Sequence, residues 1–153
     1  GYSWYDMAPN QGPGIIRSRV FLMQLLDDLQ RVLGLAPGEI FLLGFSQGSL
    51  MSIDVGLRYP KLLGGIVGIS GYVYFEEEYP QSFSAVAKHQ RIWISHGYRD
   101  SVLPIVRSEA SVMRLRELGL TIDWNPLDKE HTVDEYEEIP LIREFILTHF
   151  EAN

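Results

Sequence analysis

Apolar positions along this chain alternate between helical stripes and short continuous runs. The first stripe has roughly helical spacing and predicts a helix over 15–33 that ends at Gly34; its apolar members are Ile15, Leu22, Leu25, Leu26, Leu29 and Leu33. The next signal is the continuous run Ile40-Phe41-Leu42-Leu43, which follows a turn at Pro37-Gly38. Such a run is typical of a strand buried on both faces, as in a parallel sheet.

The same two signals repeat to the end of the chain, apart from an irregular aromatic and acidic stretch over 72–87. They predict strands over 40–43, 65–70, 90–95 and 120–124, and helices over 15–33, 47–58, 104–118 and 138–150. This alternation indicates the α/β class, with a parallel sheet covered by helices on both faces. No internal repeat or linker-like shift in composition interrupts the pattern, so we expect residues 1–153 to belong to one domain.

Ligands of parallel sheets bind where the carboxyl ends of the strands meet, so the loops there are searched first for chemistry. The loop after the first strand reads Gly44-Phe45-Ser46-Gln47-Gly48, a G-x-S-x-G pattern. In a nucleophile elbow, a strained strand-to-helix turn exposes the serine hydroxyl, and close backbone approach favours glycine two residues before and after it. The backbone N–H of Gln47 would then stabilise an oxyanion.

The context of the pentapeptide makes it informative. The composition of this chain predicts only about 0.1 chance matches, and the match follows an apolar strand and opens a helix, as the motif requires. A turn of glycine and serine without chemistry is the alternative. Ser70 in Gly68-Ile69-Ser70-Gly71 is a weaker rival nucleophile, because it lacks a glycine two residues later; we interpret it as a serine at the end of a strand.

A serine nucleophile needs a base and an orienting acid, which in this fold follow in the order Ser, Asp or Glu, His. Asp100 comes after the third predicted strand and His131 after the fourth, so both lie on successive strand-end loops beyond Ser46. Asp100 would alternatively cap the turn that follows it, and His131 would alternatively be a surface histidine. His96 ends a buried strand, and we expect it to be a hydrogen-bonded structural residue.

Composition and charge exclude several classes of function. With 13 basic and 20 acidic residues the net charge is −7, and no cluster of Lys and Arg points to nucleic acid. No apolar stretch is long enough to predict a membrane span. The chain has no cysteine, which excludes thiolate metal sites and fits a cytoplasmic protein. Neither a phosphate-binding glycine loop nor a zinc motif is present, so we expect no cofactor and no metal.

At these residues the chain resembles the phospholipase/carboxylesterase family of α/β-hydrolases, which includes acyl-protein thioesterases and small bacterial carboxylesterases. The resemblance covers nearly the whole chain and rests on separated motifs in order: Trp4-Tyr5-Asp6, Leu43-Gly44-Phe45-Ser46-Gln47-Gly48, Arg58-Tyr59-Pro60, Gly65-Ile66-Val67, Ser70-Gly71, His96-Gly97-x-x-Asp100-x-Val102-x-Pro104 and His131-Thr132-Val133.

The resemblance implies a serine hydrolase with Ser46 as nucleophile, His131 as base and Asp100 as acid. It implies acyl esters, lysophospholipids or thioesters as substrates, and no cofactor. Tyr72, Tyr74 and Phe75, with Trp4 near the start of the chain, are candidates for lining an acyl pocket; the alternative is that these aromatic residues simply cover the sheet. A peptidase or dienelactone-type hydrolase would share the same triad, and only the resemblance separates it.

The chain also departs from the family in two ways. Glu130 stands before the histidine, where the family usually has a small residue. Family members also carry further N-terminal strands and a His-Gly loop with a second oxyanion donor, so the chain resembles about the C-terminal two-thirds of such an enzyme. We therefore expect the native protein to have a further N-terminal segment of about 50–80 residues.

The incomplete match leaves open a hydrolase-like fragment that is catalytically impaired and acts as a binding or interaction module. Loss of one oxyanion donor costs a factor on the order of 10²–10³ in kcat. An open sheet edge would also allow the chain to pair with another copy.

Overall fold

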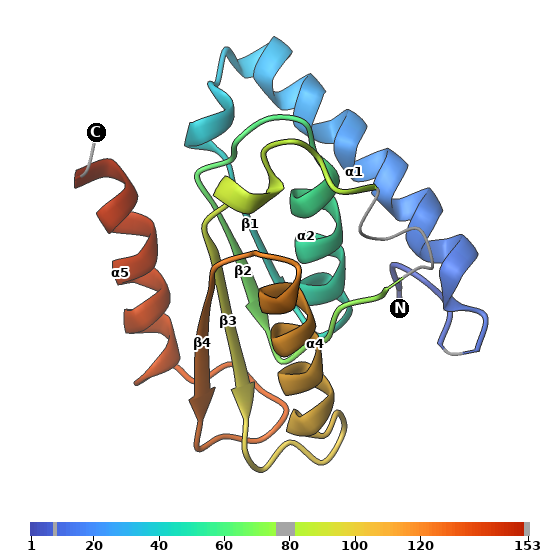
Figure 1. Ribbon diagram of the computed structural model, residues 1–153, viewed down its shortest axis with the longest axis vertical. Coiled ribbons are helices and arrows are strands. Elements are labelled where there is room, and N and C mark those ends of the chain that lie inside the picture. Colours follow the sequence, from blue (N-terminus) through green and yellow to red (C-terminus); the bar gives the residue numbers. More distant parts are fainter. Residues whose placement is uncertain (8, 76–81, 152–153) are drawn as a thin grey trace.

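The computed structural model describes residues 1–7, 9–75 and 82–151. Its centre is a parallel four-stranded sheet in the order β1-β2-β3-β4 (Figure 1). The strands are β1 (Phe41–Phe45), β2 (Gly65–Ile69), β3 (Ile92–Gly97) and β4 (Ile122–Leu127). This arrangement confirms the predicted α/β class. Parallel strands need connections that cross from one end of the sheet to the other, and here helices alternate with the strands along the chain.

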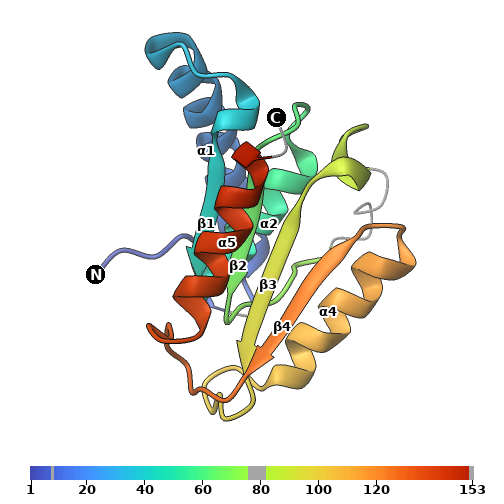
Figure 2. The ribbon, with the colours of Figure 1, turned by 90° about the vertical axis from the view of Figure 1, so that its left-hand side faces the viewer.

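Helices cover both faces of the sheet. The long helices are α1 (Gln11–Leu33), α2 (Gln47–Arg58), α4 (Ile105–Glu117) and α5 (Glu138–Glu151), with 3-10 turns η1 (Pro37–Glu39) and η2 (Ala87–His89). Helices α2 and α4 lie on one face, α1 packs outside α2, and α5 lies on the opposite face (Figures 1 and 2). Among the described residues no helix is both long and apolar enough to cross a membrane.

The buried side chains form three clusters: one between the sheet and helices α2 and α4, one between the sheet and α5, and one between α1 and α2. Ile66 and Ile94 of the sheet pack with Ile53 of α2 and Leu115 of α4. Trp93 packs with α5 on the other face, and a third cluster joins α1 to α2. Strands β2 and β3 are buried along their whole length, as their continuous apolar runs predict.

Several predicted boundaries are wrong. Strand β3, predicted over 90–95, covers Ile92–Gly97. Helix α1 begins at Gln11 rather than residue 15, because Pro13 falls in its first turn, where the missing N–H is not needed. Strand β4 continues past Trp124 to Leu127 and includes Pro126. Proline is tolerated there because β4 is an edge strand of the described sheet. Within the predicted irregular stretch 72–87, residues 76–81 lie outside the described residues.

Because the strands are parallel, their carboxyl ends lie at one edge of the sheet. The loops that follow β1, β3 and β4 carry Ser46, Asp100 and His131, and the end of β2 carries Ser70. The fold therefore places the candidate chemistry of four sequence segments at a single edge.

Candidate active site

Ser46 lies in the turn between β1 and α2. Its φ of 55° is in the left-handed region, which is rare for a residue other than glycine. The turn is held to the neighbouring strand, because the Ser46 N–H donates to the carbonyl oxygen of Ile69 at 2.8 Å. A strained serine between a strand and a helix is the geometry of a nucleophile elbow.

The two glycines of the elbow differ in how much room a side chain would have. A Cβ on Gly44 would lie 2.0 Å from the carbonyl oxygen of Gly48, so only glycine fits there. At Gly48, a Cβ would meet only Nε1 of Trp4, at 3.9 Å. The expectation that close approach favours glycine at both positions is therefore wrong for Gly48, whose Cβ direction is open among the described residues.

Asp100 has a different partner on each carboxylate oxygen. Oδ1 accepts the N–H groups of Val102 at 3.0 Å and Leu103 at 2.8 Å, so the residue does cap the turn that follows it. Oδ2 lies 2.7 Å from Nδ1 of His131. The capping role and the contact with histidine are therefore simultaneous, because the turn holds the carboxylate in the orientation that faces His131.

His131 lies between the carboxylate and the hydroxyl. Its Nδ1 is 2.7 Å from Asp100 Oδ2, and its Nε2 is 3.2 Å from Ser46 Oγ. Its side chain is 15% exposed, and the ring of Phe45 packs against it with centroids 4.8 Å apart. With the proton on Nδ1 donated to Asp100, Nε2 presents a lone pair to the serine hydroxyl.

The charge of Asp100 is stabilised despite its burial. Burial by itself raises the pKa of a carboxyl. For Asp100 the hydrogen bond from the Leu103 N–H and the bond from His131 outweigh that effect, with help from His96, and the pKa lies below its ordinary value. The carboxylate therefore stays ionised where it faces the imidazole, which stabilises a positive charge on that ring.

His96 is a second imidazole at the same carboxylate. It is fully buried, and its Nε2 lies 2.7 Å from the carbonyl oxygen of Leu103 and 3.2 Å from Asp100 Oδ2. Its Nδ1 has no partner among the described residues. Sequence reasoning predicted a hydrogen-bonded structural histidine but missed its contact with Asp100, which the spacing of four residues could have suggested.

Gln47 connects the elbow to the N-terminal segment. Its side-chain oxygen accepts the N–H of Trp4 at 3.1 Å, and its side-chain nitrogen donates to the carbonyl oxygen of Tyr5 at 3.1 Å. Gln47 is also the first residue of α2. Its backbone N–H is thus one of the donors that intrahelical hydrogen bonds leave unused.

The four candidate pocket residues do not meet in one cavity. Trp4 lines a hollow of about 420 Å³ beside β1, with Leu43 among its other residues. The other three line a separate hollow of about 460 Å³ with Arg107 of α4; they are Tyr72, Tyr74 and Phe75. The Arg107 guanidinium lies 3.8 Å from the centre of the Tyr72 ring. Neither Ser46 nor His131 lines either hollow.

Lys129 is a residue near the site that sequence reasoning missed. It is only 3% exposed, two positions before His131. Lysine is rarely buried, so no pattern of residue types marks this one. Among the described residues no group of three or more His, Cys, Asp or Glu side chains is placed to hold a metal ion.

Comparison with known proteins agrees with the motifs. Residues 2–150 match the profile of the phospholipase/carboxylesterase family. The chain belongs to this family. It is 39% identical over 114 residues to acyl-protein thioesterase 1 of Schizosaccharomyces pombe, a match that covers 74% of this chain and 50% of that protein. It is 28% identical over 143 residues to a protein of Oryza sativa subsp. japonica named a probable inactive carboxylesterase, covering 88% and 58%.

A solved structure shows the same family fold. The crystal structure of SOBER1 from Arabidopsis thaliana has a TM-score of 0.89 at 25% identity, covering 97% of this chain and 74% of that one. Together with the family match, this likeness identifies the fold of the chain as that of an α/β-hydrolase. The chain spans about half the length of the curated relatives it matches, 50% and 58% for the two above.

Proposed function

We propose that this chain carries the catalytic triad of a serine hydrolase that cleaves carboxylic esters or thioesters through an acyl-enzyme. The observation that carries the proposal is the continuous contact from Asp100 Oδ2 through His131 to Ser46 Oγ, with distances of 2.7 and 3.2 Å. These three side chains come from separate strand-end loops, and their order along the chain is that of α/β-hydrolases.

The first half of the reaction forms the acyl-enzyme. His131 Nε2 takes the proton of the Ser46 hydroxyl as Oγ attacks the acyl carbonyl, and the Gln47 N–H donates to the oxygen that becomes negative. Asp100 keeps the Nδ1 proton of His131 in place and stabilises the imidazolium. The imidazolium then returns its proton to the departing alcohol or thiol as the bond to the acyl carbon breaks.

The second half repeats these roles with water. His131 removes a proton from a water molecule that attacks the acyl carbon, and Ser46 leaves with the proton returned by His131. The product is the free carboxylic acid. The contacts of His131 with Ser46 and with Asp100, on which both halves depend, already lie at hydrogen-bonding distance.

The substrate class is supported by the relatives and by the lining of the hollows. The family description names carboxylesterases and one relative is named an acyl-protein thioesterase, so we propose small acyl esters or thioesters. The hollow that Trp4 lines also includes Phe45, the residue before Ser46, and it offers apolar surface for an acyl chain. The lack of cysteine favours a cytoplasmic setting.

Labelling with an organophosphonate tests the proposal, because the probe reacts with an activated serine hydroxyl. We expect mass spectrometry to locate the label on Ser46, no label in Ser46→Ala, and normal labelling in Ser70→Ala. Hydrolysis of a short-chain aryl ester and a short-chain thioester by the same samples gives the reaction class. A wild-type chain that is neither labelled nor active would instead support a binding module.

A further inference from the structure

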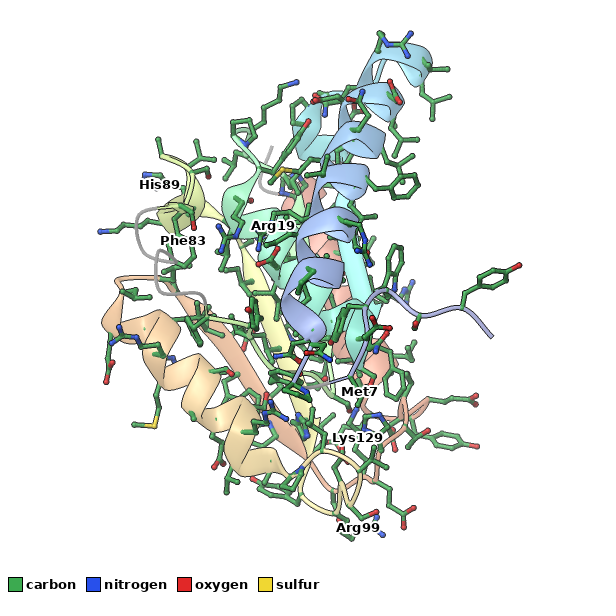
Figure 3. The ribbon with its side chains drawn as sticks, turned by 90° about the vertical axis from the view of Figure 1, so that its right-hand side faces the viewer. Met7, Arg19, Phe83, His89, Arg99 and Lys129 are labelled. Carbon is green, nitrogen blue, oxygen red and sulfur yellow. The ribbon has the colours of Figure 1, made fainter. Side chains whose placement is uncertain are left out.

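A buried ion pair lies beneath the loop that carries His131. Lys129 Nζ is 2.6 Å from Glu138 Oε1, and the two side chains are 2% and 0% exposed. Lys129 lies at the carboxyl-end edge of the sheet, at the same end of the molecule as Arg99 and Met7 (Figure 3). A buried charge pair is expensive to desolvate and is often replaceable by apolar residues without loss of stability, so its presence calls for a reason other than stability.

Every proton of the Lys129 ammonium has an acceptor. Besides Glu138, it donates to the carbonyl oxygen of Thr132 at 2.8 Å and to Ser70 Oγ at 3.2 Å. Glu138 in turn accepts the N–H of Asp134 at 2.9 Å and the hydroxyl of Ser95. A buried polar network in which every donor is used makes the arrangement of its members specific.

The members of this network adjoin each residue of the triad. Thr132 directly follows His131 in the chain. Ser70 directly follows Ile69, whose carbonyl oxygen holds the Ser46 N–H at 2.8 Å. One ammonium group therefore connects the loop of the base to the strand end that holds the nucleophile.

A third connection leads to the acid. Ser95 precedes His96, whose Nε2 lies 3.2 Å from Asp100 Oδ2. The Lys129 backbone adds a further link, because its carbonyl oxygen accepts the N–H of Arg99, the residue before Asp100, at 3.1 Å. Lys129 thus touches segments that bear on all three catalytic side chains and none of those side chains itself.

The backbone of Ser70 supports the same interpretation. Its φ of 51° is strained for a serine, and such strain persists only where surrounding contacts over-determine it. The Ser70 N–H donates to the carbonyl oxygen of Ser95 at 2.9 Å, and its hydroxyl accepts from Lys129. The network therefore holds a strained strand end next to the nucleophile turn.

We propose that Lys129, paired with Glu138, is a positioning residue that holds the His131 loop in register with Ser46. This inference rests on the proposed function. The contact it maintains is the 3.2 Å separation of His131 Nε2 and Ser46 Oγ. A displacement of about 1 Å at such a contact costs a factor on the order of 10² in rate.

The chain offers a matched control in a second buried ion cluster. Asp54 is fully buried in α2 and pairs with Arg19 at 2.6 Å and with Arg58 at 3.2 Å. Those partners lie on α1 and α2 rather than on the strand-end loops. Asp54→Asn therefore weakens a buried ion pair without a direct contact to the triad.

The test compares Lys129→Met, Glu138→Gln, the double variant and Asp54→Asn with the wild-type full chain. We expect Lys129→Met to lower kcat and the rate of organophosphonate labelling at Ser46 by about 10–100-fold, with KM changed less than about 2-fold. The double variant leaves no uncompensated charge, so it should recover the thermal midpoint lost in Lys129→Met but not the rate. Asp54→Asn should lower the thermal midpoint and keep the wild-type rate.

A spectroscopic measurement covers the case in which Lys129→Met does not fold. The downfield proton resonance of His131 Nδ1–H, bonded to Asp100, should be present in the wild type and shifted or broadened in the milder Glu138→Gln. A double variant with wild-type kcat, or an unchanged resonance in Glu138→Gln, overturns the positioning role. A wild-type chain that the probe does not label at Ser46 overturns the proposed function instead.

Discussion

Ser46 and Ser70 lie at the ends of adjacent parallel strands, and their backbone φ angles are nearly the same, 55° and 51°. Their surroundings differ. Ser46 is partly exposed with His131 Nε2 at 3.2 Å, whereas Ser70 is fully buried and its hydroxyl accepts from an ammonium group. A strained serine at a strand end is therefore not enough to make a nucleophile. The Ser46 hydroxyl can donate a hydrogen bond to an imidazole, whereas the Ser70 hydroxyl accepts one from an ammonium.

Removing each hydroxyl in turn gives the largest expected contrast. Ser46→Ala should lower kcat by at least about 10⁴-fold, because the nucleophile of a triad contributes most of its rate. The measurement is hydrolysis of a short-chain aryl ester, with circular dichroism to show that the fold persists. Residual activity above one hundredth of wild type would contradict the assignment of Ser46.

Asp100→Asn removes the carboxylate that orients His131, the base that faces Ser46. We expect kcat to fall on the order of 10³–10⁴-fold, because the amide no longer holds the proton on His131 Nδ1. The amide oxygen can still accept the N–H groups of Val102 and Leu103, so the turn should survive. Wild-type turnover in this variant would exclude Asp100 as the acid.

Substitution of the two glycines of the elbow shows at which position the turn needs glycine. Gly44→Ala places a Cβ only 2.0 Å from the carbonyl oxygen of Gly48. We expect this overlap to lower the free energy of unfolding by roughly 1–3 kcal/mol or more and to abolish activity. Gly48→Ala meets only Trp4, at 3.9 Å, and should remain folded. Thermal unfolding of both variants checks this, and equal losses would show that the elbow needs glycine at both positions.

Ser70→Ala tests the other member of the comparison. It leaves Lys129 with acceptors on Glu138 and Thr132 only, so we expect a loss of about 1 kcal/mol, the usual contribution of one hydrogen bond. The kcat for the aryl ester should fall less than about 10-fold. A loss as large as that of Ser46→Ala would mean that the two serines are not distinguished by their partners.

The pH dependence of stability is the smallest expected effect. The pKa of Asp100 is lower in the folded chain than its ordinary value. Its charge therefore stabilises the fold above the unfolded pKa of about 3.9, and this contribution is lost as pH falls through the folded pKa. Thermal midpoints of wild type and Asp100→Asn should converge as pH drops below about 4. A constant difference down to the lowest pH would contradict the role of the charge.

Local patterns predicted much of this architecture. The apolar runs at Ile40-Phe41-Leu42-Leu43 and 65–70, and the helix over 47–58, are each specified by residues close in sequence, and the structure has elements in those places. The prediction that the first run is buried on both faces is wrong, because β1 is an edge strand of the described sheet and Leu43 is exposed. The elbow around Ser46 is also local, since its glycines and its strand-turn-helix context lie within a few residues. The order of Ser46, Asp100 and His131 then predicted their meeting, because parallel strands end at one edge.

Contacts between distant segments decided the rest. The burial of Lys129 depends on Ser70 and Glu138, 59 and 9 residues away, and nothing in its immediate neighbours marks it. The separation of Trp4 from the Tyr72 hollow likewise follows from the packing of whole elements. Sequence alone determined which residues follow each strand, because strand and helix periods are local properties of the chain. Only the tertiary structure showed that the Ser70 hydroxyl faces the Lys129 ammonium, because burial and charge at a site are summed over every segment that meets there.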